Sequence, residues 1–80
     1  MEIVRWHVCK YYTATKDLTV TIGIFLQEED AREYYRWKKR QLAAENKKRE
    51  IPHGFKWQLH KHIQRCDDSG VRDELVLVEG

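Results

Sequence analysis

The segment Thr19-Val-Thr-Ile-Gly-Ile-Phe-Leu-Gln-Glu-Glu-Asp-Ala-Arg-Glu-Tyr-Tyr-Arg-Trp-Lys-Lys-Arg-Gln-Leu42 changes its hydrophobic period halfway along. Up to Ile24 the apolar residues alternate, which predicts a β-strand. From Ala31 onward they recur at the spacing of one face of a helix. A strand that runs directly into a helix is one half of an α+β domain, so the rest of the chain has to supply strands that pair with it.

The flanking sequence contains three further alternating runs. Together with the opening segment they predict strands over Glu2–Tyr12, Leu18–Phe25, Phe55–Ile63 and Val71–Val78. Short polar turns separate the members of each pair, which is typical of antiparallel hairpins. The predicted order is β-β-α-β-β over a single domain, residues 1–80. This order predicts the α+β class: a two-layer sandwich with one helix on one face of an antiparallel sheet.

The helix is expected to begin near Gln27–Glu28 and to end before Ile51-Pro52-His53-Gly54, since Pro and Gly interrupt helices. Its buried stripe is predicted at Ala31, Tyr35, Lys38 and Leu42. In the strand before the helix, the even residues Leu18, Val20, Ile22 and Ile24 are expected to share the side opposite to Thr19, Thr21, Gly23 and Phe25.

If the first strand lies between the second and the third, one sheet face has no helix over it. Its side chains are then polar and mildly basic, and the main ones are Arg5, His7, Tyr11, Lys56, His60 and His62, with Cys9, Thr19, Thr21, Gln58 and Gln64 among them. An antiparallel sheet can leave one face in water.

Two residues of the opening segment do not fit a regular pattern. Gly23 lies inside a strand, which indicates a bulge or a close approach of the backbone. Trp37 lies well outside the buried stripe of the helix. It either covers an edge of the sheet or is exposed, and in the second case it is a candidate interface anchor, because Trp beside Arg is common at binding hot spots.

Charge is unevenly distributed, although the formal net charge is only +2. The run from Arg36 to Arg49 holds seven basic residues against the single acid Glu45, and acids gather at Glu28–Asp30 and Asp67–Glu74. A local basic patch can attract polyanions even on a nearly neutral protein. The alternative is a solvated helix face with no partner.

Cys9 and Cys66 are far apart in the sequence and form no dense cysteine framework. Without an apparent signal peptide, we expect free thiols and a cytoplasmic location. No apolar run approaches the length of about 20 residues that a membrane span needs.

The central segment resembles a broad group of small uncharacterised bacterial and phage proteins. The likeness rests on Gly23-Ile24-Phe25, Gln27-Glu28-Glu29-Asp30-Ala31, Tyr34-Tyr35 and the later run Phe55-Lys56-Trp57-Gln58-Leu59, and it extends from Val4 to Ile63. The resemblance implies the fold and a phage or mobile-element origin, and it carries over no functional residues. Small proteins of such genomes are often inhibitors that occupy a surface of a host protein.

One group of side chains has ligand chemistry. His7 and Cys9 share one face of the first strand, and His60 and His62 share one face of the third. If the two strands are neighbours, these four side chains converge, and zinc takes such ligands. Flat sheet faces rarely provide a tetrahedral site, so ordinary solvent-facing residues are the competing interpretation, and we expect no cofactor.

Motifs for catalysis are absent from the sequence: there is no Gly-rich phosphate loop, nucleophile elbow or HExxH segment. We therefore expect a protein that is not an enzyme. Nucleic-acid binding through the basic helix is the second hypothesis, although the open sheet face offers only Tyr11 and Phe25 for base stacking.

The leading hypothesis is a small interaction protein, an accessory or inhibitor protein of phage type that binds a protein partner. Its expected contact residues lie on the exposed side of the helix and are Arg32, Arg36, Trp37, Arg40 and Lys47. The two edge strands of the sheet are also open to strand addition or to homodimerisation.

Overall fold

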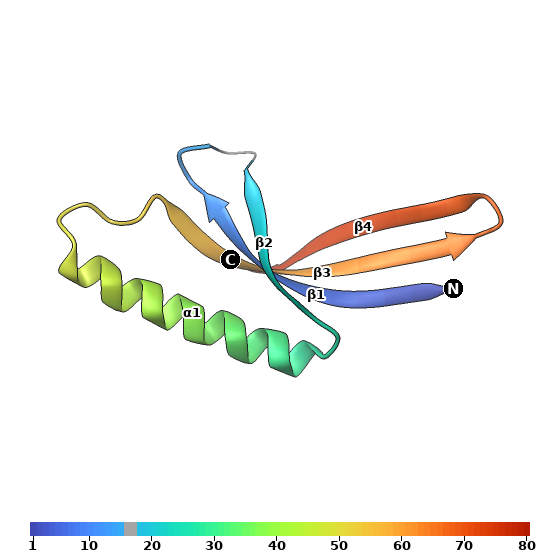
Figure 1. The fold of residues 1–80 in the computed structure, drawn as a ribbon, viewed down its shortest axis with the longest axis horizontal. Helices are drawn as coiled ribbons and strands as arrows, with labels where there is room; N and C mark the ends of the chain where they lie inside the picture. The colour runs from blue at the N-terminus through green and yellow to red at the C-terminus, as the bar shows by residue number, and fades with distance from the viewer. Residues whose placement is uncertain (16–17) are drawn as a thin grey trace.

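The computed structural model describes residues 1–15 and 18–80. It contains one helix and four strands, in the order β1 (Glu2–Tyr12), β2 (Thr19–Phe25), α1 (Glu28–Lys48), β3 (Phe55–Asp67) and β4 (Gly70–Glu79). The strands form one antiparallel sheet in the spatial order β2-β1-β3-β4. The predicted α+β class and β-β-α-β-β order are confirmed, with α1 packed on one face of the sheet (Figure 1).

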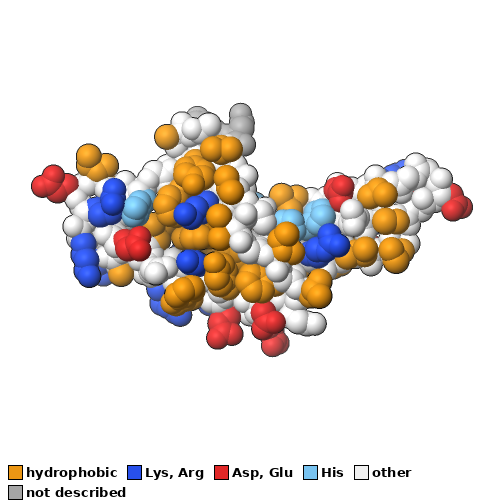
Figure 2. All heavy atoms as spheres, in the orientation of Figure 1, with side chains coloured by type: hydrophobic (Ala, Val, Ile, Leu, Met, Phe, Trp, Pro, Cys, Tyr) orange, Lys and Arg blue, Asp and Glu red, His pale blue; other side chains and the backbone are white. Residues whose placement is uncertain are grey.

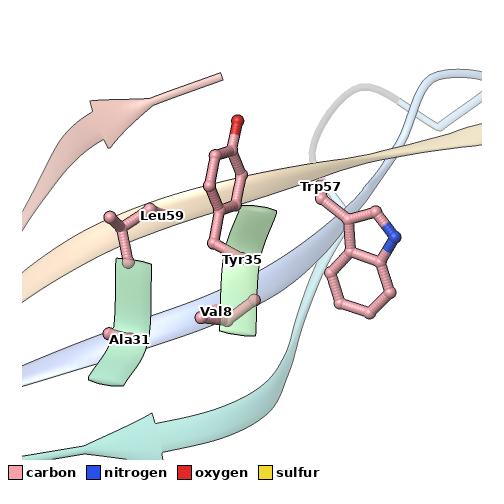
Figure 3. Close-up of a cluster of buried hydrophobic side chains, with 5 residues drawn as sticks. All are labelled: Val8, Ala31, Tyr35, Trp57 and Leu59. Atoms are coloured by element: carbon pink, nitrogen blue, oxygen red, sulfur yellow. The ribbon is translucent and has the colours of Figure 1, made fainter. Parts of the chain in front are cut away.

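The core lies between α1 and the central strands. Val8 and Leu59 are paired across β1 and β3, and the helix places Ala31 and Tyr35 on them while Trp57 closes the cluster (Figure 3). All of these side chains are buried. Of the predicted stripe, Ala31 and Tyr35 are buried, whereas Lys38 and Leu42 are only partly buried. The helical period from Ala31 onward therefore predicted correctly which side of α1 faces the sheet.

Three lysines interrupt the apolar pattern of the sides that α1 and the sheet turn toward each other, and each one lies over an aromatic ring. The ammonium of Lys10 is 4.5 Å from the ring centre of Phe55, and that of Lys61 is 5.5 Å from Trp6. Lys38 lies 5.7 Å from the ring of Trp57. Cation–π attraction and burial of the aliphatic stems allow these lysines to occupy a mostly apolar face.

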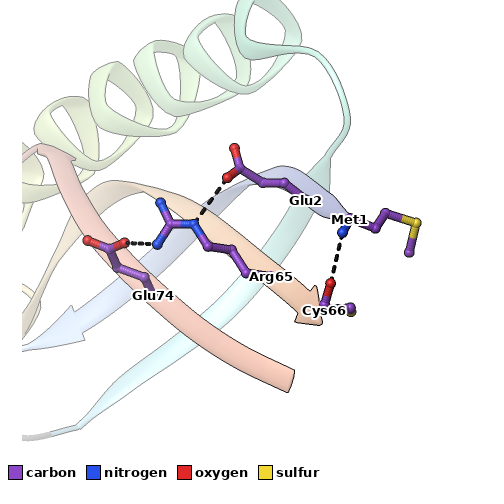
Figure 4. A network of polar contacts seen from close by, with 5 residues as sticks. All are labelled: Met1, Glu2, Arg65, Cys66 and Glu74. Carbon is purple, nitrogen blue, oxygen red and sulfur yellow. Dashed lines mark hydrogen bonds and ion pairs between the residues drawn. The ribbon is translucent and has the colours of Figure 1, made fainter. Parts of the chain in front are cut away.

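The helix covers only part of the sheet. The molecule measures 54 × 27 × 15 Å, and the hairpin of β3 and β4 extends with the start of β1 as an arm away from α1 (Figure 1). At the arm, Arg65 donates to Glu2 at 3.1 Å and to Glu74 at 3.2 Å (Figure 4). These bonds connect all three strands of the arm, which has no helix over either face.

Strand β3 continues beyond the predicted end at Ile63. Gln64 and Arg65 pair with Ile3 and Glu2 of β1, and the amide of Cys66 donates to the carbonyl of Met1 at 2.8 Å. The polar composition of this stretch concealed its strand structure. The turn then begins after Asp67, and Gly70 starts β4 with a φ of +126°, a value that favours glycine.

Strand β2 contains the irregularity that Gly23 predicted. The register with β1 shifts at Ile22, because Val8 pairs with Gly23 while Cys9 pairs with Thr21. A Cβ atom on Gly23 would lie 2.9 Å from the ring of Phe25, so both a bulge and a close approach are present.

The bulge changes which residues of β2 face α1. Phe25 is opposite Trp6 and packs against the core, whereas Ile24 is opposite His7 on the open face and is 59% exposed. The prediction that Ile24 shares a side with Val20, and Phe25 with Thr21, is wrong beyond the bulge. One extra residue reverses the alternation.

Among the described residues, no helix is long and apolar enough to cross a membrane. Cys9 and Cys66 are free thiols, as expected.

Candidate functional site

Four of the five expected contact residues of α1 are exposed. Ala31 and Tyr35 are buried against the sheet, so the helical period turns Arg36, Arg40 and Lys47 toward solvent. Trp37 lies at the flank between these two sides. We call Arg36, Trp37, Arg40 and Lys47 the docking surface.

Trp37 combines the two alternatives that the sequence left open. It continues an aromatic row that starts on β2: the ring centres of Phe25 and Tyr34 are 5.3 Å apart, and those of Tyr34 and Trp37 are 5.9 Å apart. The indole therefore overhangs the β2 side of the sheet. At the same time 49% of its surface is exposed.

A shallow groove of about 320 Å³ runs along this aromatic row. Its lining residues are Phe25, Asp30, Glu33, Tyr34 and Trp37. The ammonium of Lys38 lies 4.8 Å from the ring centre of Trp37 but does not line the groove. The exposed indole is thus held by Tyr34 and Lys38 of the helix, and Phe25 of β2 supports Tyr34. This arrangement reduces the conformational entropy that a partner would have to remove on binding.

Arg32 differs from the other expected contact residues. Its Nε lies 3.4 Å from a carboxylate oxygen of Glu28, and its Nη1 lies 3.2 Å from one of Glu79. The guanidinium therefore connects the first turns of α1 to the end of β4. We assign Arg32 a structural role and leave it out of the docking surface.

The basic residues along the rest of α1 are not neutralised within the part of the chain that the structure describes. No ion pair there involves Arg36, Lys39, Arg40, Lys47 or Lys48. Glu45, the only acid of the basic run, is paired with His53 at 3.3 Å. The helix consequently has an acidic N-terminal end and a basic C-terminal half, and the docking surface extends from the middle of the helix into the basic half.

The expected open face is also present. Arg5 is opposite His62, His7 is opposite His60, and Tyr11 is opposite Lys56, so these six side chains share the face away from α1. The rings of His7 and His62 are 4.9 Å apart. Three buried ring nitrogens have no hydrogen-bond partner within the described chain: His7 Nε2, His60 Nδ1 and His62 Nδ1.

Burial determines the protonation of this histidine cluster. It lowers the pKa of His7, which the neighbouring His62, His60 and Arg5 lower further. It also lowers the pKa of His60. Both imidazoles therefore favour the neutral form in the folded protein, and the open face is less basic near neutral pH than its composition indicates.

The four candidate metal ligands do not form a ligand set. Among residues 1–15 and 18–80, no three His, Cys, Asp or Glu side chains are grouped closely enough to hold a metal ion. The Cys9 thiol lies 3.7 Å from the hydroxyl of Thr21, and burial raises its pKa, which disfavours the thiolate that binds zinc. His62 Nε2 lies 3.0 Å from Asp73. The structure gives the metal hypothesis no support.

Sequence reasoning missed how apolar the open face becomes toward the edges of the sheet. Leu77 is opposite His60 and Leu75 is opposite His62, so β4 adds two exposed leucines to this face. Figure 2 shows histidine side chains with hydrophobic side chains beside them on the β3–β4 half of the molecule. The run Leu75–Val78 is apolar on both sides, and its alternation could not assign a face.

In comparisons with known proteins, no protein-family model, curated protein or solved structure matches this chain. The resemblance to small phage and bacterial proteins therefore stays a prediction.

Proposed function

We propose that the protein is a non-catalytic binding module that docks on another protein through the docking surface of α1. The observation that carries the proposal is the half-exposed indole of Trp37, which is held by Tyr34 and lies in the same stretch of α1 as the exposed residues Arg36 and Arg40. Trp and Arg are the residues most enriched at interface hot spots.

The positive charge of the docking surface indicates which surface chemistry its partner has. Arg36, Arg40 and Lys47 are exposed and have no acidic partner in the described chain, so a complementary surface carries carboxylates around an apolar pocket for the indole. Long-range attraction between such surfaces raises the association rate and weakens with salt. A protein with this role would act by occupying its partner's surface.

Affinity capture from lysate of the cells that carry the gene tests this proposal, with nuclease treatment to remove bridging nucleic acid. The double variant Arg36→Glu/Arg40→Glu is expected to lose the captured protein. The matched control Lys56→Glu/Arg72→Glu changes the net charge equally at exposed positions on the sheet, and it should retain the captured protein. Equal capture by both double variants would contradict the proposal.

A second function, nucleic-acid binding, is favoured by one observation: the basic residues of α1 from Arg36 to Lys48 lack ion pairs in the described chain. Fluorescence anisotropy with labelled DNA and RNA over a salt series distinguishes it. Binding that weakens steeply with salt would support contacts to phosphates, since each neutralised phosphate releases counterions. An unchanged anisotropy at low salt would exclude this function for α1.

A further inference from the structure

The edge of the sheet formed by β2 lacks most of the features that prevent edge-to-edge pairing. The stretch from Leu18 to Leu26 contains no charged residue and no proline. Its exposed aliphatic side chains are Leu18, Val20, Ile22, Ile24 and Leu26. Natural edge strands are usually protected by charge, proline or a bulge, and β2 has only the bulge.

The opposite edge of the sheet provides a comparison within the same molecule. Strand β4 also exposes aliphatic side chains, but it carries the charged residues Arg72, Asp73, Glu74 and Glu79. Side-chain charge therefore protects β4 from pairing and leaves β2 as the available edge.

The two halves of β2 match each other in the faces that they present. Val20 and Phe25 are opposite Lys10 and Trp6 and face α1, whereas Thr21 and Ile24 are opposite Cys9 and His7 and face away from it. An antiparallel pairing of two β2 strands around Ile22–Gly23 places Val20 opposite Phe25 of the second copy, and Thr21 opposite its Ile24. Both pairs lie on matching faces, as directly opposed residues must.

The flank of α1 above β2 is complementary to itself in charge. The groove residues Asp30 and Glu33 lie toward its N-terminal end and Trp37 lies in the middle, and the helical period places Lys48 on the same flank at its C-terminal end. A two-fold axis perpendicular to the sheet keeps both helices on one face and makes them antiparallel. The acidic end of each helix then lies alongside the basic end of the other.

From these two independent features we infer that the protein forms a symmetric dimer in which β2 pairs antiparallel with β2 of a second copy. The two sheets become one continuous sheet with both helices on the same face. The dimer buries aliphatic side chains that the small core of a single chain leaves exposed. Arg36, Arg40 and Lys47 of both docking surfaces still face outward from α1, and each Trp37 lies beside the seam between the two helices. The inference does not depend on the proposed function.

Light scattering coupled to size-exclusion chromatography tests this inference on the full chain. The wild-type protein is expected to elute with twice the chain mass of 9.7 kDa. Ile22→Lys, at a position that is 45% exposed in the single chain, should elute as a single chain with an unchanged circular dichroism spectrum. The matched control Val76→Lys, an exposed aliphatic residue on the other edge strand, should stay dimeric.

A disulfide test covers the case in which Ile22→Lys does not fold. Ile22→Cys in a Cys66→Ser background should form a cross-linked dimer on mild oxidation, because the pairing is centred beside this residue, and Val76→Cys in the same background should not. A wild-type protein with the mass of one chain at every concentration, an open-ended assembly, dissociation by Val76→Lys instead of Ile22→Lys, or no cross-link at Ile22→Cys would each overturn the inference.

Discussion

Single side chains explain how a small sheet tolerates polar residues on both faces. On the helix side, the ammonium groups of Lys10, Lys38 and Lys61 lie over aromatic rings. On the other side, buried nitrogens of His7, His60 and His62 have no hydrogen-bond partner in the described chain. Burial lowers the pKa of His7 and His60, so the neutral imidazole is favoured at these two positions.

The histidine cluster should make stability depend on pH. The pKa values of His7 and His60 are lowered below their ordinary value of 6.5, so the unfolded chain takes up protons first as the pH falls. The contribution of these two residues to the free energy of unfolding is fully present above pH 6.5. It is lost as the pH falls from 6.5 through the lowered pKa values of the folded state. The charged groups that face the cluster are Arg5 and Asp73, and neither neutralises His7 or His60.

Urea unfolding at about pH 7.5 and about pH 5 measures this effect. The free energy of unfolding is expected to be lower at the acidic pH. His60→Gln should reduce the difference between the two values, whereas His53→Gln, outside the cluster, should not. Equal stability of the wild-type protein at both values would show that the cluster does not titrate with folding.

At the scale of the elements, β2 shows why a sequence pattern can predict a strand and still misplace its faces. The alternation of Val20, Ile22 and Ile24 is regular in sequence, but the bulge beside Gly23 reverses it and places Phe25 in the core. Gly23 itself was the signal for the bulge. Its consequence for the faces depended on the register with β1, which alternation alone does not fix.

Gly23→Ala should be destabilising because the added Cβ would lie 2.9 Å from the ring of Phe25. Overpacking of this kind costs about 1–3 kcal/mol. Gly54→Ala is the matched control, since no atom lies within 4 Å of its Cβ position. Its free energy of unfolding in urea should stay within about 0.5 kcal/mol of the wild-type value. A similar loss for both variants would contradict the close packing of Phe25 on Gly23.

Helix α1 covers one part of the sheet and leaves the other part uncovered. Helix α1 packs on the half of the sheet that contains Val8 and Leu59, and the arm of β3 and β4 extends beyond it (Figure 1). Local stability follows the burial of apolar contacts. We therefore expect the backbone amides of residues 71–77 to exchange with deuterium faster than those of Val8 and Leu59. Uniform protection along the chain would show that the arm is covered in solution.

The order of the elements and the fold class could be predicted from the sequence, because hydrophobic periodicity and turn residues are local signals. Sequence reasoning also placed Arg36 and Arg40 on the outward side of the helix, since the helical stripe around Ala31 and Tyr35 fixes what faces outward, but it left the exposure of Trp37 open. The ion pairs of Arg32 with Glu28 and Glu79 could not be predicted, because they depend on how the end of β4 approaches the helix.

The most direct test of the proposed docking surface is photo-crosslinking in cells with a benzophenone amino acid at position 37. The account predicts an adduct between this chain and a different protein, identified by mass spectrometry. The same probe at Val76 on β4 should not give that adduct, and a product of twice the chain mass would report the dimer separately. The absence of any heterologous adduct at position 37, or the same adduct from both positions, would contradict docking through α1.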